Sequence, residues 1–161
     1  DSAGNVFVSA DAGGSWERLP VGAPVSTRSL TIMPTQGLMY LGTTDQGVLA
    51  GDGRNRWASA NGFVNGALPT IDAPSIVYDA SSGDSFEGVN GRFEGALYAG
   101  TDLGVFKSVD GGVSWNRLAL DIAVEALTVG GGDPNVITAV DGRGRIFRSA
   151  DRGLSWDFGA R

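Results

Sequence analysis

Three aspartates recur in short turn sequences of similar composition, and they are the residues in this chain best suited to chemistry. Asp45 lies in Thr-Asp-Gln-Gly, Asp102 lies in Thr-Asp-Leu-Gly, and Asp141 opens Asp-Gly-Arg-Gly, with Arg143 two residues later. Two carboxylates on either side of a sugar ring can hydrolyse a glycosidic bond. The same residues can instead bind a polar ligand, or simply build hairpin turns. We therefore treat these four residues as weak binding candidates and assign no catalytic residue.

The composition excludes several other chemistries. The chain has 161 residues and contains neither cysteine nor histidine, so disulfides, thiolate catalysis, histidine catalysis and Cys/His metal sites are ruled out. Its net charge of −6 argues against nucleic-acid binding, because neutralising phosphates requires clustered Lys and Arg. No apolar run approaches the ~20 residues that span a bilayer. We expect no metal, no cofactor, no nucleic-acid partner and no membrane insertion.

A repeated motif, Ser-x-Asp-x-Gly-x-Ser-Trp, organises the chain. A shorter, degenerate copy lacks the serine. Successive motif tryptophans stand about 41 residues apart, except that about 17 additional residues separate the middle pair; a period near 40–45 is typical of propeller blades. The motif residues are Ser9, Asp11, Gly13 and Trp16; Asp52 and Trp57 of the degenerate copy; Ser108, Asp110, Gly112 and Trp115; and Ser149, Asp151, Gly153 and Trp156.

The segments between the motifs predict β-strands. They are short apolar runs rich in Val, Ile, Leu and Phe, bounded by Gly, Asp, Asn and Pro, and none has helical periodicity. The predicted fold class is all-β, with four antiparallel strands per blade and about three and a half blades. The predicted divisions are a half blade over 1–19, a blade over 20–60, a blade over 61–118 with an insertion over 80–95, and a blade over 119–161.

The motif itself has a local structural explanation. Its aspartate can accept hydrogen bonds from backbone N–H groups further along the turn, and its glycine supplies a positive φ without a Cβ penalty. The tryptophan then packs beneath the turn. A calcium loop would need more carboxylates at alternating positions than one aspartate per turn. We interpret the motif residues as structural.

The motif resembles the Asp-box, or bacterial neuraminidase repeat. That family consists of β-propellers: sialidases, xyloglucanase-type glycoside hydrolases, sortilin-like receptors and photosystem assembly factors. The resemblance implies that the box is a fold-stabilising turn and that ligands bind at the opposite face, where Asp45, Asp102 and Asp141 would lie. It also implies a secreted or periplasmic protein. The insertion over 80–95 should emerge on the Asp-box face, and we expect deletion of Ser82 to Glu94 to spare the fold.

The chain lacks the Arg-Ile-Pro motif of sialidases. We expect a non-catalytic propeller module that binds a protein or a glycan; the alternative is a fragment of a glycoside hydrolase, xyloglucanase-type before sialidase. Closed propellers typically use about four to eight blades, because closure removes exposed sheet edges. We therefore expect further blades of a longer parent, or another chain such as a second copy, to complete this one.

Overall fold

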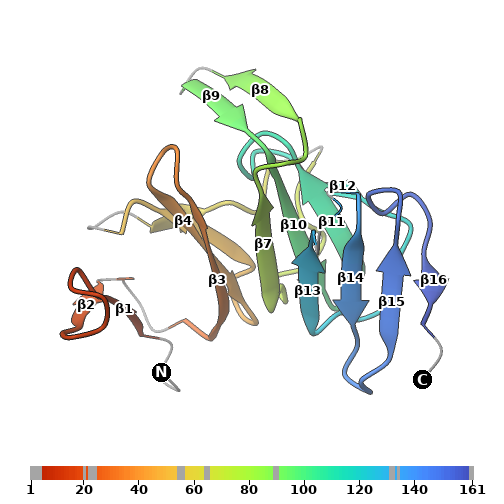
Figure 1. Cartoon of the computed structure of the whole chain (residues 1–161), viewed down its shortest axis with the longest axis horizontal. Helices are drawn as coiled ribbons and strands as arrows, with labels where there is room; N and C mark the ends of the chain where they lie inside the picture. The colour runs from red at the N-terminus through yellow and green to blue at the C-terminus, as the bar shows by residue number, and fades with distance from the viewer. Residues whose placement is uncertain are drawn as a thin grey trace.

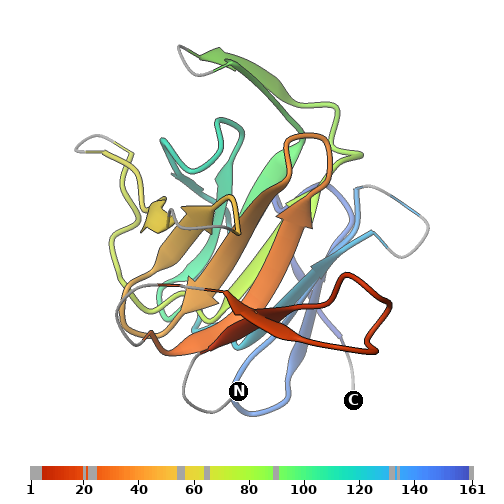
Figure 2. The same cartoon turned by 90° about the vertical axis from the view of Figure 1, so that its left-hand side faces the viewer.

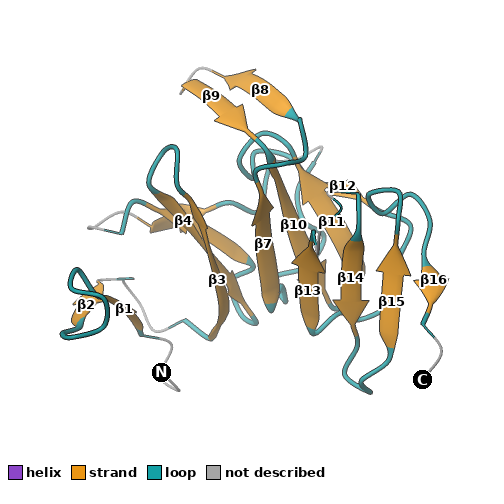
Figure 3. Ribbon diagram, in the orientation of Figure 1, coloured by secondary structure: helices purple, strands orange, loops and turns teal. Residues whose placement is uncertain are grey.

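The computed structural model describes residues 5–19, 21, 25–53, 57–63, 66–88, 91–130, 133 and 135–159. Strands are the only regular secondary structure in these ranges (Figure 3). The predicted all-β fold class is thereby confirmed. Over the same ranges, no helix is long and apolar enough to cross a membrane.

Three of the sheets contain four antiparallel strands, which adjoin in chain order. In each of these sheets the strands are counted in chain order, and the fourth strand follows one motif turn or its degenerate copy. The second sheet comprises β3 (Thr27–Met33), β4 (Leu38–Thr43), β5 (Val48–Gly51) and β6 (Trp57–Ser59); the third comprises β7 (Ser75–Asp79), β10 (Ala96–Thr101), β11 (Gly104–Ser108) and β12 (Asn116–Arg117); the fourth comprises β13 (Ala126–Val129), β14 (Ile137–Val140), β15 (Ile146–Ser149) and β16 (Asp157–Phe158).

Two further sheets have two strands each in the described residues. The first sheet pairs β1 (Val6–Val8) with β2 (Glu17–Leu19), and a hairpin pairs β8 (Ser85–Gly88) with β9 (Gly91–Glu94). Figure 1 shows the first to fourth sheets following one another in chain order, with the hairpin projecting beyond β7 and β10. Figure 2 shows β1 and β2 crossing in front of the second sheet.

The core lies between neighbouring sheets. One cluster joins the second and third sheets, and its buried members include Met33, Tyr40, Ile76, Leu97 and Trp115. A second cluster joins the third and fourth sheets. Strand alternation explains this arrangement, because each four-stranded sheet presents successive side chains to its two neighbours.

Side-chain hydroxyls join the first strands of neighbouring sheets. Ser29 Oγ on β3 accepts a hydrogen bond from the Ile76 N–H on β7 at 2.9 Å, and Thr31 Oγ1 accepts from the Tyr78 N–H at 3.1 Å. One sheet further on, Ser75 Oγ accepts from the Leu127 N–H of β13 at 3.0 Å. The first strands β7 and β13 therefore donate backbone N–H groups to hydroxyls of the first strand before them.

The three full motifs form the same turn, which we call the serine–aspartate turn (residues 9–16, 108–115 and 149–156). In the middle copy the Ser108 hydroxyl donates to Asp110 Oδ1 at 2.8 Å and accepts from the Gly112 N–H at 2.9 Å. The Ser114 N–H and hydroxyl donate to the two Asp110 oxygens at 2.9 and 2.5 Å. Gly112 has φ +89°, which favours glycine. The other two copies repeat this network.

The second and third serine–aspartate turns also contact the sheet that precedes them. Trp115 Nε1 donates to the Ala60 carbonyl at 2.8 Å, and Ala60 follows the last strand of the preceding sheet. A Cβ added to Gly112 would lie 2.7 Å from the same carbonyl. Gly153 approaches Leu118 in the same way, one sheet later. In the degenerate copy, whose middle residues lie outside the described ranges, Trp57 Nε1 is enclosed without a hydrogen-bond partner in the described structure.

These turns predict a specific acid sensitivity. The Ser15 N–H, followed by the Ser15 and Ser9 hydroxyls, lowers the pKa of Asp11 from 3.8 to about 2. In the last turn the Ser155 hydroxyl and N–H and the Ser149 hydroxyl lower the pKa of Asp151 to about 2. A carboxylate with a depressed folded-state pKa stabilises the fold above its unfolded pKa, and this contribution is lost as the pH falls from about 4 towards 2.

Urea unfolding at pH 7, 4, 3 and 2.5 tests this sensitivity. We expect the urea concentration at the unfolding midpoint of the unchanged chain to decrease as the pH is lowered below 4. The midpoint of Asp151→Asn should decrease less over the same pH range, because the stabilisation by the Asp151 charge is already absent. Asp157→Asn, an exposed carboxylate on β16, is the matched control. An identical acid profile for Asp151→Asn and the unchanged chain would contradict the assignment.

The insertion forms the β8–β9 hairpin and contributes to the core. Phe93 is 6% exposed and packs in the cluster between the second and third sheets, whereas its cross-strand partner Phe86 is 41% exposed. The Tyr78 hydroxyl donates to the Glu94 carbonyl at 2.7 Å. The hairpin, Tyr40 and the middle serine–aspartate turn together line a cavity of about 730 Å³. The insertion thus lies at the serine–aspartate end, but its deletion would remove a core side chain, which revises the expectation that the fold is spared.

Candidate functional site

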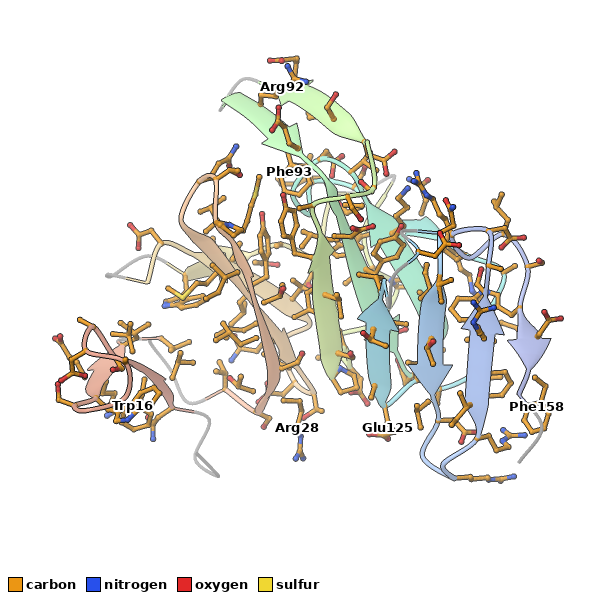
Figure 4. The ribbon with its side chains drawn as sticks, viewed as in Figure 1. Trp16, Arg28, Arg92, Phe93, Glu125 and Phe158 are labelled. Atoms are coloured by element: carbon orange, nitrogen blue, oxygen red, sulfur yellow. The ribbon has the colours of Figure 1, made fainter. Side chains whose placement is uncertain are left out.

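An acidic cavity of about 600 Å³ opens where the first strands of three sheets begin. Its charged lining residues are Arg28, Asp72, Asp102 and Glu125, and Ser29, Thr44 and Ser75 add polar groups. Figure 4 shows Arg28 and Glu125 at the same lower edge of the molecule, Arg28 at β3 and Glu125 at β13, the first strands on either side of β7. We call this site the acidic cavity.

The start of each first strand positions these charges. Arg28 is the second residue of β3, Asp72 lies three residues before β7, and Glu125 immediately precedes β13. Asp102 lies in the turn that joins β10 to β11. In a four-stranded antiparallel sheet the first strand begins at the end where the second strand finishes. Chain direction therefore brings all four residues to one end of the molecule, opposite the serine–aspartate turns.

The surroundings of Asp72 disfavour the ionised form of its carboxyl group. Burial raises the pKa of Asp72, the negative charges of Asp102 and Glu125 raise it further, and the Arg28 charge opposes them. Its Oδ1 atom is enclosed and has no hydrogen-bond partner among the described residues. A buried carboxylate oxygen without a donor is costly. A ligand that donates a hydrogen bond to this oxygen would relieve that cost.

The structure brings one of the four sequence-predicted binding residues into the cavity, namely Asp102. Asp45 instead accepts the Ser26 N–H at 3.1 and 3.2 Å, which holds the segment that enters β3. Arg143 is exposed on its turn. The recurrence of aspartate in these turns therefore does not correspond to a recurring place in one site.

Asp141 holds its own turn together. It is buried and accepts hydrogen bonds from the Arg143 and Arg145 N–H groups at 3.0 and 2.9 Å, and from Arg145 Nε at 2.6 Å. Burial of Asp141 acts against ionisation, but these hydrogen bonds outweigh it and lower the pKa of Asp141. Its oxygens are committed to the turn.

Sequence reasoning did not identify Asp72, and it assigned no site role to Arg28 and Glu125. A signal does exist, because each complete sheet has a charged residue near the start of its first strand. The three residues differ in type and in distance from the strand, so the signal becomes visible only when the strand boundaries are known. Within the described part of the chain, no three acidic side chains are placed to hold a metal ion.

Comparison with known proteins supplies the fold. No protein-family model matches the chain, and no curated protein does either. An ancestral GH74 enzyme matches 100% of this chain with a TM-score of 0.68 and 18% identity, over 22% of its own length. The GH74 enzyme of Niastella koreensis matches 96% with a TM-score of 0.68 and 17% identity, over 25% of its length.

YCF48 bound to a D1 peptide matches 84% of this chain with a TM-score of 0.54 and 16% identity, over 42% of its own length. At such low identities these likenesses establish the β-propeller fold and nothing about ligands. The chain spans about a quarter or less of the two GH74 enzymes.

Proposed function

We propose that this chain is a non-catalytic recognition module of a β-propeller protein, and that its acidic cavity binds a Lys or Arg side chain of a protein partner. The acidic cavity is the observation that carries the proposal. Among the described residues that line it, three carboxylates, Asp72, Asp102 and Glu125, face one cation, Arg28. An ammonium or guanidinium group would neutralise part of this charge and donate a hydrogen bond to Asp72 Oδ1.

Two further observations support a protein partner. The net charge of −6 would steer a basic segment towards the chain. In addition, YCF48, which shares the propeller fold, has been solved with a bound D1 peptide. A glycan remains the other ligand class of this proposal, because carboxylates also accept hydrogen bonds from sugar hydroxyls. We also propose a secreted or periplasmic location, which the resemblance of the motif to the Asp-box implies.

A peptide series tests the ligand class. Peptides of Gly and Ser with one central Arg, Lys or Gln are titrated by calorimetry against the chain, alongside neutral oligosaccharides. We expect the Arg and Lys peptides to bind and the Gln peptide to bind at least tenfold more weakly. Asp72→Asn should weaken Arg-peptide binding by about 10–100-fold, because a hydrogen bond to a charged group is worth about 1.5–3 kcal/mol.

Asp45→Asn is the matched control, since it removes a carboxylate at the same end of the molecule outside the acidic cavity. Equal weakening by Asp45→Asn and Asp72→Asn would contradict the proposed site. Preferential binding of the neutral oligosaccharides would replace the protein partner with a glycan.

One observation favours glycoside hydrolysis as a second candidate function. Glycosidases pair a carboxyl group of raised pKa with a second carboxyl group, and burial raises the pKa of Asp72, which lines the cavity together with Asp102 and Glu125. Two GH74 enzymes also share the fold. Incubation with xyloglucan and β-glucan tests this candidate: turnover that Asp72→Asn abolishes would overturn the non-catalytic proposal.

We also propose that further blades complete the propeller, supplied by a longer parent chain or by another chain. The two-stranded first sheet supports this, because each of the three four-stranded sheets has two more strands beside the pair that is equivalent to β1 and β2.

A further inference from the structure

The first sheet leaves an open edge beside an apolar strand face. The strands equivalent to β1, namely β5, β11 and β15, are each paired on both sides, whereas β1 pairs only with β2 in the described ranges. On β3, Leu30 is 45% exposed and Ile32 is 51% exposed. A cavity of about 330 Å³ lies between residues 5–7 and residues 27–30. We call this the β1–β3 groove.

The side-chain directions along β3 show which residues point into the groove. Ser29 and Thr31 point towards β7, because their hydroxyls accept hydrogen bonds from that strand. Strand alternation therefore points Leu30 and Ile32 the other way, into the groove. At the next junction β7 presents Ile76 to β3 in the same manner, and Ile76 is 2% exposed there.

The hydroxyl pattern between first strands identifies a polar requirement. Leu30 pairs with Leu41 as Ile76 pairs with Ala99 and Leu127 with Ala139, so these three residues occupy one position of the repeat. The Ile76 and Leu127 N–H groups each donate to a serine of the preceding first strand. By the same register, the Leu30 N–H requires a hydroxyl at the position of Ser29 in a preceding strand.

The pairing of second and third strands identifies an apolar requirement. Ala99 lies opposite Phe106, Ala139 lies opposite Phe147, and Leu41 lies opposite Leu49. Phe7 occupies the position of these third-strand residues in β1, since Val-Phe-x-Ser recurs in both sheets. A strand that pairs with β1 should therefore present a small or aliphatic residue opposite Phe7.

We propose that the β1–β3 groove binds an antiparallel β-hairpin from a further repeat of this type. Its second strand adds to the open edge of β1, and its first strand covers Leu30 and Ile32. That first strand contains a serine followed by Leu or Ile, and the serine hydroxyl accepts a hydrogen bond from the Leu30 N–H. Residues 27–43 and the β7–β10 pair share this pattern: Ser-Leu or Ser-Ile in the first strand, and Tyr-Leu-Gly-Thr or Tyr-Ala-Gly-Thr in the second. This inference rests on, and deepens, the proposed completion of the propeller.

A synthetic peptide of residues 27–43 is the probe, added to the whole chain. We expect saturable one-to-one binding by calorimetry, together with at least tenfold slower hydrogen exchange in residues 5–9 and 28–32. A Ser29→Ala peptide should bind about three- to tenfold more weakly, because it lacks the accepting hydroxyl. In the protein, Leu30→Lys should abolish binding, whereas Leu154→Lys, at a more exposed leucine of the last serine–aspartate turn, should not.

Each remaining outcome overturns the proposal. If the unchanged peptide does not bind, the groove does not recognise this hairpin. The same conclusion follows if the Ser29→Ala peptide binds as tightly as the unchanged peptide, and if the Leu30→Lys protein binds the peptide as tightly as the unchanged protein. Sedimentation tests whether a second copy of the chain occupies the groove instead. A dimer that Thr128→Val disrupts would show that β13 of a second copy, which carries the exposed Thr128 hydroxyl, packs against β3. Arg-peptide binding at the acidic cavity, measured on the same sample, is independent of all these outcomes, so failure here and failure of the proposed function are distinguishable.

Discussion

Replacement of Trp115 by alanine is expected to lower the free energy of unfolding by about 3–5 kcal/mol, the usual cost of truncating a buried aromatic side chain. Trp16→Ala, at the same position of the first serine–aspartate turn, is expected to change it by less than about 1 kcal/mol. Trp115 is 5% exposed and Trp16 is 64% exposed. The two substitutions remove the same atoms from the same local motif, so their difference isolates packing between sheets.

The Trp115 substitution also removes a hydrogen bond to Ala60, which leaves the carbonyl of a buried residue without that donor. Urea unfolding of both variants is followed by far-ultraviolet circular dichroism, because each substitution removes a tryptophan and so changes the fluorescence signal itself. Similar losses for Trp16→Ala and Trp115→Ala would show that the motif acts within its own turn and not between sheets.

Phe93→Ala is expected to cost about 3–5 kcal/mol of unfolding free energy, whereas Phe86→Ala should cost less than about 1 kcal/mol. The two phenylalanines face each other across the β8–β9 hairpin, so the pair changes equal volumes in one element. Phe93 packs edge to face with Tyr78, with ring centroids 6.2 Å apart, and belongs to the core between the second and third sheets.

Thermal unfolding by calorimetry provides the comparison for this pair. A lower Tm for Phe93→Ala with a nearly unchanged Tm for Phe86→Ala would place the hairpin within the cooperative unit. If neither variant changes the Tm, the insertion does not contribute to the core and can be deleted, as the sequence alone suggested.

The strands and the serine–aspartate turns were predictable because their causes are local. The spacing of Ser108, Asp110 and Ser114 places each acceptor within reach of its donor in one turn, and Gly112 supplies the positive φ that the turn requires. Short apolar runs between such turns have few alternatives to antiparallel pairing. Repetition of the motif then indicated the number and order of the sheets.

The acidic cavity was not predictable in the same way. Arg28, Asp72 and Glu125 belong to three different units and share no motif, and only the side-by-side packing of β3, β7 and β13 places them around one cavity. The recurring Asp45 and Asp141 were easier to notice, but their oxygens accept hydrogen bonds from nearby backbone. Asp45 holds the segment that enters β3, and Asp141 holds its own turn, so their recurrence reflects local structure in each unit and not one shared site.

By itself the sequence determined the all-β class, the repeat and the conformation of each serine–aspartate turn, since those depend on contacts between residues a few positions apart. Only the tertiary structure decided which copies of a motif matter for stability and where charge gathers. Trp16 and Trp115 have nearly identical neighbours in sequence, yet one is exposed and the other is buried against Ala60. The difference arises because burial depends on the sheet that stands beside the turn, and residues distant in the chain supply that sheet.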